Sequence, residues 1–152
     1  MNQVIDKQHL HQICLQMIQQ KITETQATIS VAGISAQAET KSTAGDKHDT
    51  ARAMAHLEQE KYAAVLAQQK AAEDLLLRIN PAKVSPTVGA GSVVVSTMGT
   101  FYIAAPLGKC ESGGQEIFVL SSSSPLAVAI RGLKAGDSFS MAGKPQRIIA
   151  LF

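Results

Sequence analysis

Hydrophobic residues near the start of the chain recur at alternating steps of three and four, the spacing of a helix with one apolar face. Residues 8–38 contain no proline and a single glycine, Gly33. The pattern predicts a helix over this range. Its apolar stripe has the spacing of a coiled-coil seam and consists of Leu15, Ile18, Ile22, Thr25, Ile29, Ala32 and Ala36.

A second helix is predicted over residues 46–79, which contain neither Gly nor Pro and are rich in strong helix formers. It ends before Pro81, because the residue preceding a proline disfavours the α conformation. Two apolar stripes are candidates for contact with the first helix. One consists of Ala53, Leu57, Ala64, Ala67 and Ala71, and the other of Tyr62, Val65, Ala72, Leu76 and Ile79.

The two helices are joined by a short polar segment, so we expect an antiparallel helical hairpin, a coiled coil, with its tip near residues 39–50. The tip acids have two open interpretations. Asp46 and Asp49 fall at the start of the second helix, where negative charge is stabilising for purely structural reasons. Alternatively, Glu39, Asp46 and Asp49 present carboxylates to a partner.

Short apolar runs separated by glycine-containing turns follow a linker over residues 81–90, and they predict a small β-rich domain. The expected strands are 92–96, 100–105, 116–120, 138–141 and 146–152. The fold class is therefore α+β. The expected organisation is a helical hairpin over 1–80, the linker over 81–90 and the β-rich domain over 91–152.

One short helix is predicted to interrupt the strands. Ser124 is a suitable N-cap, Pro125 suits the first helical position, and Gly132 lies just past the end. The residues expected to face the sheet are Leu126, Ala129 and Ile130.

Charge and cysteine content narrow the class of protein. The net charge of +2 is too small to indicate a nucleic-acid binder by itself. Residues 1–80 contain 8 Lys/Arg and 9 Asp/Glu, and residues 81–152 contain 6 and 3. Cys14 and Cys110 are the only cysteines and form no metal motif or disulfide framework. We expect Cys14 to be a buried helix thiol. No apolar stretch approaches the ~20 residues that span a bilayer, so a cytoplasmic protein without a membrane partner is expected.

The segment over residues 121–139 reads SSSSPLAVAIRGLKAGDSF, and it carries a resemblance to a known family. Together with the order hairpin, linker and β-rich domain, it resembles the Gre transcript-cleavage factors of bacterial RNA polymerase. Their carboxy-terminal domain has a stretch of the form S-S-P-[IL]-x-x-A-[IL]-x-G-x-x-x-G-D. The residues that match it are Ser123, Ser124, Pro125, Leu126, Ala129, Ile130, Gly132, Gly136 and Asp137.

The resemblance implies a function. The β-rich domain would resemble an FK506-binding-protein fold and dock at the rim of the secondary channel of bacterial RNA polymerase. The hairpin would extend toward the active site, with indirect contact to nascent RNA. Tip carboxylates would help to hold a Mg²⁺ ion shared with the polymerase. The polymerase itself would cleave the transcript. The chain would therefore be an accessory factor with no cofactor of its own. The implied catalytic residues are Glu39, Asp46 and Asp49, with Asp46 and Asp49 as metal ligands, and the partner-binding residues are Ser123, Ser124, Pro125, Arg131, Lys134 and Asp137.

The tip departs from the family form D-L-S-E-N-A-E-Y-H-A-A-K. When His48 is set against its tyrosine, Lys41, Ala44 and Lys47 occupy the positions of its three acids. Three hypotheses stay open: a factor that stimulates transcript cleavage, a channel-binding regulator without cleavage, and a coiled-coil adaptor unrelated to polymerase. A prolyl isomerase rests on fold analogy alone. It is disfavoured because the small domain needs most of its aromatic rings for its core.

Overall fold

In the computed structural model the described residues are 5–40 and 45–152, and the side chains of residue 32 and residues 34–49 lie outside the description. Contacts divide the chain into two compact units. The β-rich unit comprises Met1–Met17 and Ala72–Phe152, and the hairpin unit comprises Ile18–Ala71. These units are defined by contacts, so the predicted domain boundaries at residues 80 and 90 stay a prediction.

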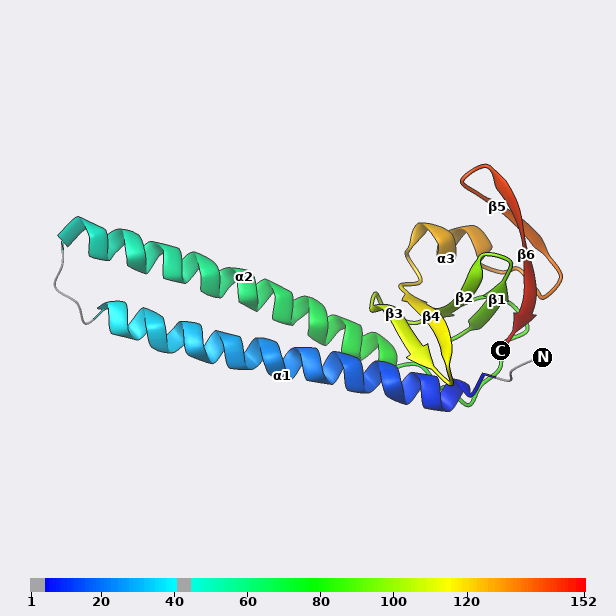
Figure 1. Ribbon diagram of the computed structural model, residues 1–152, viewed down its shortest axis with the longest axis horizontal. Helices are drawn as coiled ribbons and strands as arrows, with labels where there is room; N and C mark the ends of the chain where they lie inside the picture. Colours follow the sequence, from blue (N-terminus) through cyan, green and yellow to red (C-terminus); the bar gives the residue numbers. More distant parts are fainter. Residues whose placement is uncertain (1–4, 41–44) are drawn as a thin grey trace. The chain divides into compact units, whose positions relative to one another are not determined.

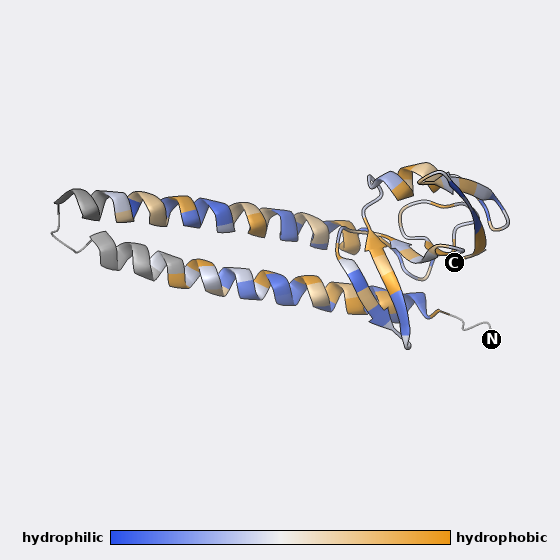
Figure 2. Ribbon diagram, turned by 45° about the horizontal axis from the view of Figure 1, so that its top comes forward, coloured by the Kyte–Doolittle hydropathy of each residue, from blue (hydrophilic) through white to orange (hydrophobic). Residues whose placement is uncertain are grey.

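Two long helices form the first part of the chain, as predicted. Helix α1 covers Lys7–Thr40 and helix α2 covers Gly45–Leu77, with lengths of 34 and 33 residues. They run antiparallel and side by side (Figures 1 and 2). The Asp6 carboxylate accepts a hydrogen bond of 3.1 Å from the main-chain N–H of His9, which satisfies one of the unpaired donors at the start of α1.

The predicted seam of α1 is confirmed where side chains are described. In the hairpin unit Ile18 and Ile22 are buried, while Thr25 and Ile29 are half-buried. The side chains of Ala32 and Ala36 lie outside the described residues. Figure 2 shows apolar and polar residues alternating along both helices, so the buried face is narrow.

On α2 only the second predicted stripe is buried. Tyr62 and Val65 are half-buried. The first stripe was a wrong prediction, because Leu57 is 64% exposed and its four alanines are also exposed. The half-buried positions of α2 include Gln59 and Gln69, and an added Cβ on Gly33 would stand 3.6 Å from Gln59 Nε2. Polar residues therefore occupy part of the seam. A prediction based on the spacing of apolar residues cannot identify these positions.

The β-rich unit contains one six-stranded sheet with the order β3-β4-β2-β1-β6-β5. Strands β2 and β4 pair in parallel, and the other neighbours are antiparallel. The strands are β1 Val93–Ser96, β2 Gly99–Ile103, β3 Gly108–Ser112, β4 Gln115–Leu120, β5 Ser138–Met141 and β6 Lys144–Leu151.

The five predicted strands are all present, with ends shifted by a few residues, and β3 is an additional one. It lies at an edge of the sheet, and of its side chains only Cys110 is buried. Lys109 and Glu111 are exposed on either side of it. A strand with a single apolar residue gives no hydrophobic alternation, so the sequence pattern could not reveal it.

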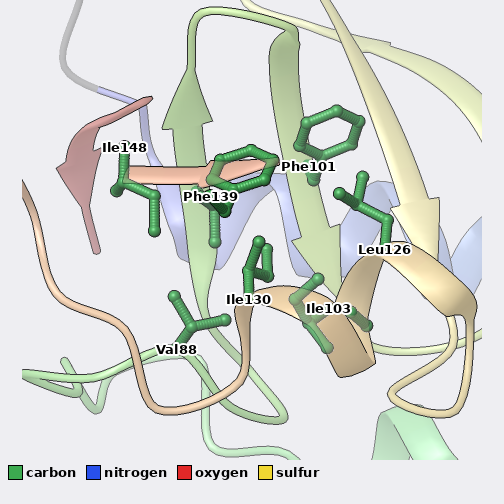
Figure 3. Packing of buried hydrophobic residues seen from close by; sticks show 9 residues of the cluster. Val88, Phe101, Ile103, Leu126, Ile130, Phe139 and Ile148 are labelled. Atoms are coloured by element: carbon green, nitrogen blue, oxygen red, sulfur yellow. The ribbon is translucent and has the colours of Figure 1, made fainter. Parts of the chain in front are cut away.

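Helix α3, Pro125–Ile130, packs its buried face on the sheet. Figure 3 shows Leu126 and Ile130 beside Phe101, Ile103 and Phe139. The cluster also contains Val88, Val94, Ala127 and Ile148. Ala129 was wrongly expected in this face. Ala127 is buried and Ala129 is exposed. At 3.6 residues per turn the two alanines lie equally far from the arc between Leu126 and Ile130, so helical spacing alone does not distinguish them.

Candidate partner-binding surface

The start of α3 is fixed by the serine and proline of the family-like segment. Ser124 has an extended backbone, with φ −64° and ψ 151°, and its Oγ accepts a hydrogen bond of 3.3 Å from the Ala127 N–H. Pro125 follows at a position where no main-chain donor is needed. Ahead of them, the Ser121 and Ser123 hydroxyl oxygens are 2.8 Å apart. Ser124 therefore caps the helix.

The end of α3 is tied back to its start and to the segment before the sheet. Arg131 Nη2 donates a hydrogen bond of 2.9 Å to the Ser122 carbonyl. Gly132 adopts φ 81° and its N–H donates to the Val88 carbonyl at 2.9 Å. Val88 in turn donates to the Leu133 carbonyl at 2.8 Å. The first of these bonds holds the Arg131 side chain near the start of α3, and the other two join the end of α3 to Val88.

A turn closes the segment before β5. The Asp137 carboxylate accepts a hydrogen bond of 2.8 Å from the Lys134 N–H, and the Asp137 N–H donates to the Lys134 carbonyl at 3.0 Å. Gly136 supplies the positive φ, 94°, that this turn requires. Asp137 therefore has a local structural role.

Most residues that match the family form thus fix the local fold. Of the predicted partner-binding residues, Ser123, Pro125, Arg131, Lys134 and Asp137 are exposed and Ser124 is half-buried. The sequence prediction omitted Val128, whose side chain is 53% exposed on the outer face of α3. Its position opposite the buried face was the available signal. The exposed apolar side chain of Val128 gives this surface an anchor that a partner can cover.

The predicted tip acids lie in helical positions. Glu39 is in the last turn of α1, and Asp46 and Asp49 are at the start of α2. Their side chains are outside the described residues, so their proposed catalytic and metal roles stay predictions. Among the described side chains, no group of three or more His, Cys, Asp or Glu residues is placed to hold a metal ion.

Two buried polar pairs lie within the β-rich unit. His11 Nδ1 is 2.7 Å from the Tyr102 hydroxyl, and burial is the main cause that lowers the pKa of His11. Burial, reinforced by the Cys110 thiol, raises the pKa of Cys14 to about 12. The prediction that Cys14 is a buried thiol is confirmed. The proximity of Cys14 to Cys110 could not be predicted, because Cys110 lies on β3, the strand that the sequence pattern did not reveal.

The aromatic rings are largely used by the core. Phe101, Tyr102 and Phe139 are buried, which leaves Phe118, 36% exposed, and the half-buried Phe152 as the other rings of the domain. An apolar pocket for a proline ring needs aromatic side chains that face solvent. This arrangement offers no support to the prolyl isomerase hypothesis.

No family model matches the chain, and comparison with curated proteins also gives no match. Among solved structures, the chain is similar to the transcription factor Gfh1, at 19% identity over 91% of this chain and 92% of that one, with a TM-score of 0.37. A likeness this loose carries no argument about function.

Within the described part of the chain, no helix is both long and apolar enough to span a membrane.

Proposed function

We propose that this chain is a transcription accessory factor that binds bacterial RNA polymerase, inserts its helical hairpin into the secondary channel and modulates elongation. The observation that carries the proposal is the family-like segment around α3. Its matching residues have definite local roles here: Ser124 caps α3, Gly132 and Gly136 adopt positive φ, and Asp137 closes a turn. These roles give the matching residues a structural reason, and they support the resemblance on which the proposal rests.

The hairpin supports the same proposal. Two helices of nearly equal length on either side of a polar tip make a slender element, with a seam narrow enough to leave most of its surface exposed. Such an element is suited to entering a confined space in a partner. The adaptor hypothesis uses the same exposed surface, and polymerase binding separates the two.

Within this function, occupancy of the channel without cleavage is a second candidate, and the tip sequence favours it. Lys41, Ala44 and Lys47 stand where the resembled family has acids. Stimulated cleavage would require Asp46 and Asp49, with Glu39, to supply the oxygen ligands of a Mg²⁺ shared with the polymerase. Because carboxylate oxygens suit Mg²⁺, these residues are the ones to test.

The test is binding and RNA cleavage with a stalled, backtracked complex of the cognate polymerase. Wild type is compared with Asp46→Asn/Asp49→Asn. The matched control is Glu24→Gln/Glu60→Gln, which removes two exposed carboxylates elsewhere on the hairpin. Cleavage lost only in the tip variant supports the cleavage factor. Binding without cleavage by wild type supports the occupancy regulator, and absence of polymerase binding overturns the proposed function.

The docking surface is tested in the same binding assay. Arg131→Glu/Lys134→Glu reverses two exposed charges beside α3, while Lys144→Glu reverses one at an exposed position of β6. If the α3 surface docks on polymerase, the first variant loses affinity at least about tenfold and the control retains it. Equal affinities for all three proteins would remove the α3 surface from the interface.

A further inference from the structure

A cleft in the β-rich unit is lined by positive charge. It has a volume of about 440 Å³, and its cationic residues are Lys7 at the start of α1, Arg78 just after α2, and Lys83 in the segment before the sheet. Ser85 and Ser122 add hydroxyl groups to its lining. Among the described residues that line the cleft, none has a carboxylate side chain. Three cations from separate segments therefore converge on one concavity.

Lys7 gives the cleft a buried charge. Its side chain is only 8% exposed, and its Nζ donates hydrogen bonds to the Lys83 carbonyl at 2.8 Å and the Phe152 carbonyl at 3.3 Å. The ion pair found among the described residues is Lys109–Glu116, so no described carboxylate side chain neutralises Lys7. Burial accordingly lowers the pKa of Lys7. A buried cation with no carboxylate side chain beside it is unfavourable, and an anion in the cleft would offset that cost.

Arg78 and Lys83 supply exposed positive charge to the cleft. Both are exposed, and neither forms an ion pair with a described residue. A guanidinium group binds phosphate oxygens through two parallel N–H bonds, and lysine adds a compact positive charge. The cleft wall is also closely packed, since a Cβ on Gly91 would stand 3.1 Å from Ile79 Cγ2. The cleft therefore combines two exposed cations with a closely packed wall.

We propose that this cleft binds a phosphate-bearing small molecule of about the size of a mononucleotide. The volume falls within the range of small-molecule sites, about 300–1,000 Å³. The cleft offers one arginine, two lysines and two hydroxyl groups. These groups suit a ligand with phosphate oxygens better than a ligand with a single carboxylate. The inference does not depend on polymerase binding, because the ligand would be held by this chain alone.

The experiment is calorimetric titration of the full chain with pyrophosphate at low salt, repeated with ADP and with adenosine. Wild type is compared with Arg78→Gln/Lys83→Gln and with Lys144→Gln, an exposed cation outside the cleft. We expect pyrophosphate and ADP to bind and adenosine not to bind. The double variant should weaken pyrophosphate binding on the order of tenfold to a hundredfold, while Lys144→Gln should leave it unchanged.

Two results would overturn the proposal. One is no detectable binding of pyrophosphate or ADP by wild type at millimolar concentrations. The other is an equal loss of affinity in Lys144→Gln, which would mean that the anion responds to general positive charge. Amide chemical shifts locate the ligand independently: shifts at Gly91 and Ser122 support the cleft, and shifts confined to Lys134 contradict it.

Discussion

The imidazole Nδ1 of His11 lies 2.7 Å from the hydroxyl oxygen of Tyr102, and both side chains are buried. His11 belongs to α1 and Tyr102 to β2, so this hydrogen bond joins the first helix to the sheet within the β-rich unit. The two rings meet edge to face, with centroids 6.1 Å apart. A polar link therefore lies inside an otherwise apolar contact.

Loss of this link should destabilise the protein. Tyr102→Phe leaves the buried ring nitrogen of His11 without its hydroxyl partner and should lower the free energy of unfolding by about 1–2 kcal/mol. Tyr62→Phe is the matched control, because the Tyr62 hydroxyl makes an exposed bond of 3.3 Å to Glu58. Urea denaturation measures both. Equal effects would contradict a special role for the buried pair.

Stability should fall in mild acid because of His11. Burial is the largest cause that lowers its pKa from 6.5, and nearby Lys7 adds to it, while a main-chain hydrogen bond to Leu76 opposes it. The unfolded chain therefore binds the proton at a higher pH than the folded chain does. The contribution of neutral His11 to the free energy of unfolding is complete above about pH 6.5. It is lost as the pH falls from there through the lowered pKa of the folded state.

This pH effect is measured by urea denaturation at about pH 7.5 and about pH 5.5. His11→Gln should reduce the difference between the two conditions. His9→Gln, which changes an exposed imidazole two residues earlier, should retain it. A pH dependence that survives in His11→Gln would show that another group is responsible.

The N-cap of α3 offers a third prediction. Ser124→Ala removes the acceptor of the Ala127 N–H and should cost about 1 kcal/mol of stability. Ser123→Ala removes an exposed hydroxyl that bonds to Ser121 and should change stability by less than about 0.5 kcal/mol. Thermal unfolding of the two variants makes the comparison, and equal melting temperatures would refute the assigned cap.

The seam of the hairpin unit contains a buried polar atom. Gln69 Oε1 is inaccessible and has no hydrogen-bond partner among the described residues. Gln69→Leu removes this unpaired acceptor and should raise the free energy of unfolding by about 1 kcal/mol. Gln68→Leu places the same side chain at the neighbouring exposed position and should give no such gain. Stabilisation by both variants would point to helix propensity instead.

The two thiols should be chemically inert in the folded protein. Cys14 and Cys110 are both buried, and burial raises the pKa of each, to about 12 for Cys14. Little thiolate is then present near neutral pH, and the thiolate is the reactive form. A chromogenic thiol reagent should react slowly with native protein and release two equivalents after denaturation. Rapid reaction of either thiol before unfolding would contradict this arrangement.

The sequence revealed those elements whose hydrophobic pattern is regular. Ile18 and Ile22 have the expected helical spacing and are buried, and Ser124, Pro125 and Gly132 bound α3 as predicted. The prediction was wrong where polar residues take apolar positions, as Gln59 and Gln69 do in the seam, and it missed strand β3.

The cleft and the His11–Tyr102 hydrogen bond could not be predicted as well from the sequence, because their contacts join residues that are far apart in the chain. Lys7 and Lys83 are 76 positions apart, and His11 and Tyr102 are 91 apart. No local periodicity reports such pairs, so neither the cleft nor the buried link could be anticipated. The family-like segment was visible, but its residues are largely explained by local backbone requirements, such as the cap at Ser124 and the turn at Asp137.

The pairing of β1 with β6 has a consequence for the order of folding during synthesis. Val94 is opposite Leu151, and Val93 and Phe152 exchange two main-chain hydrogen bonds. Strand β1, in the centre of the sheet, therefore stays unpaired on one side until β6 has been synthesised. A fragment that stops before Lys144 would leave one side of β1 unpaired, and that open edge would invite strand exchange with another copy.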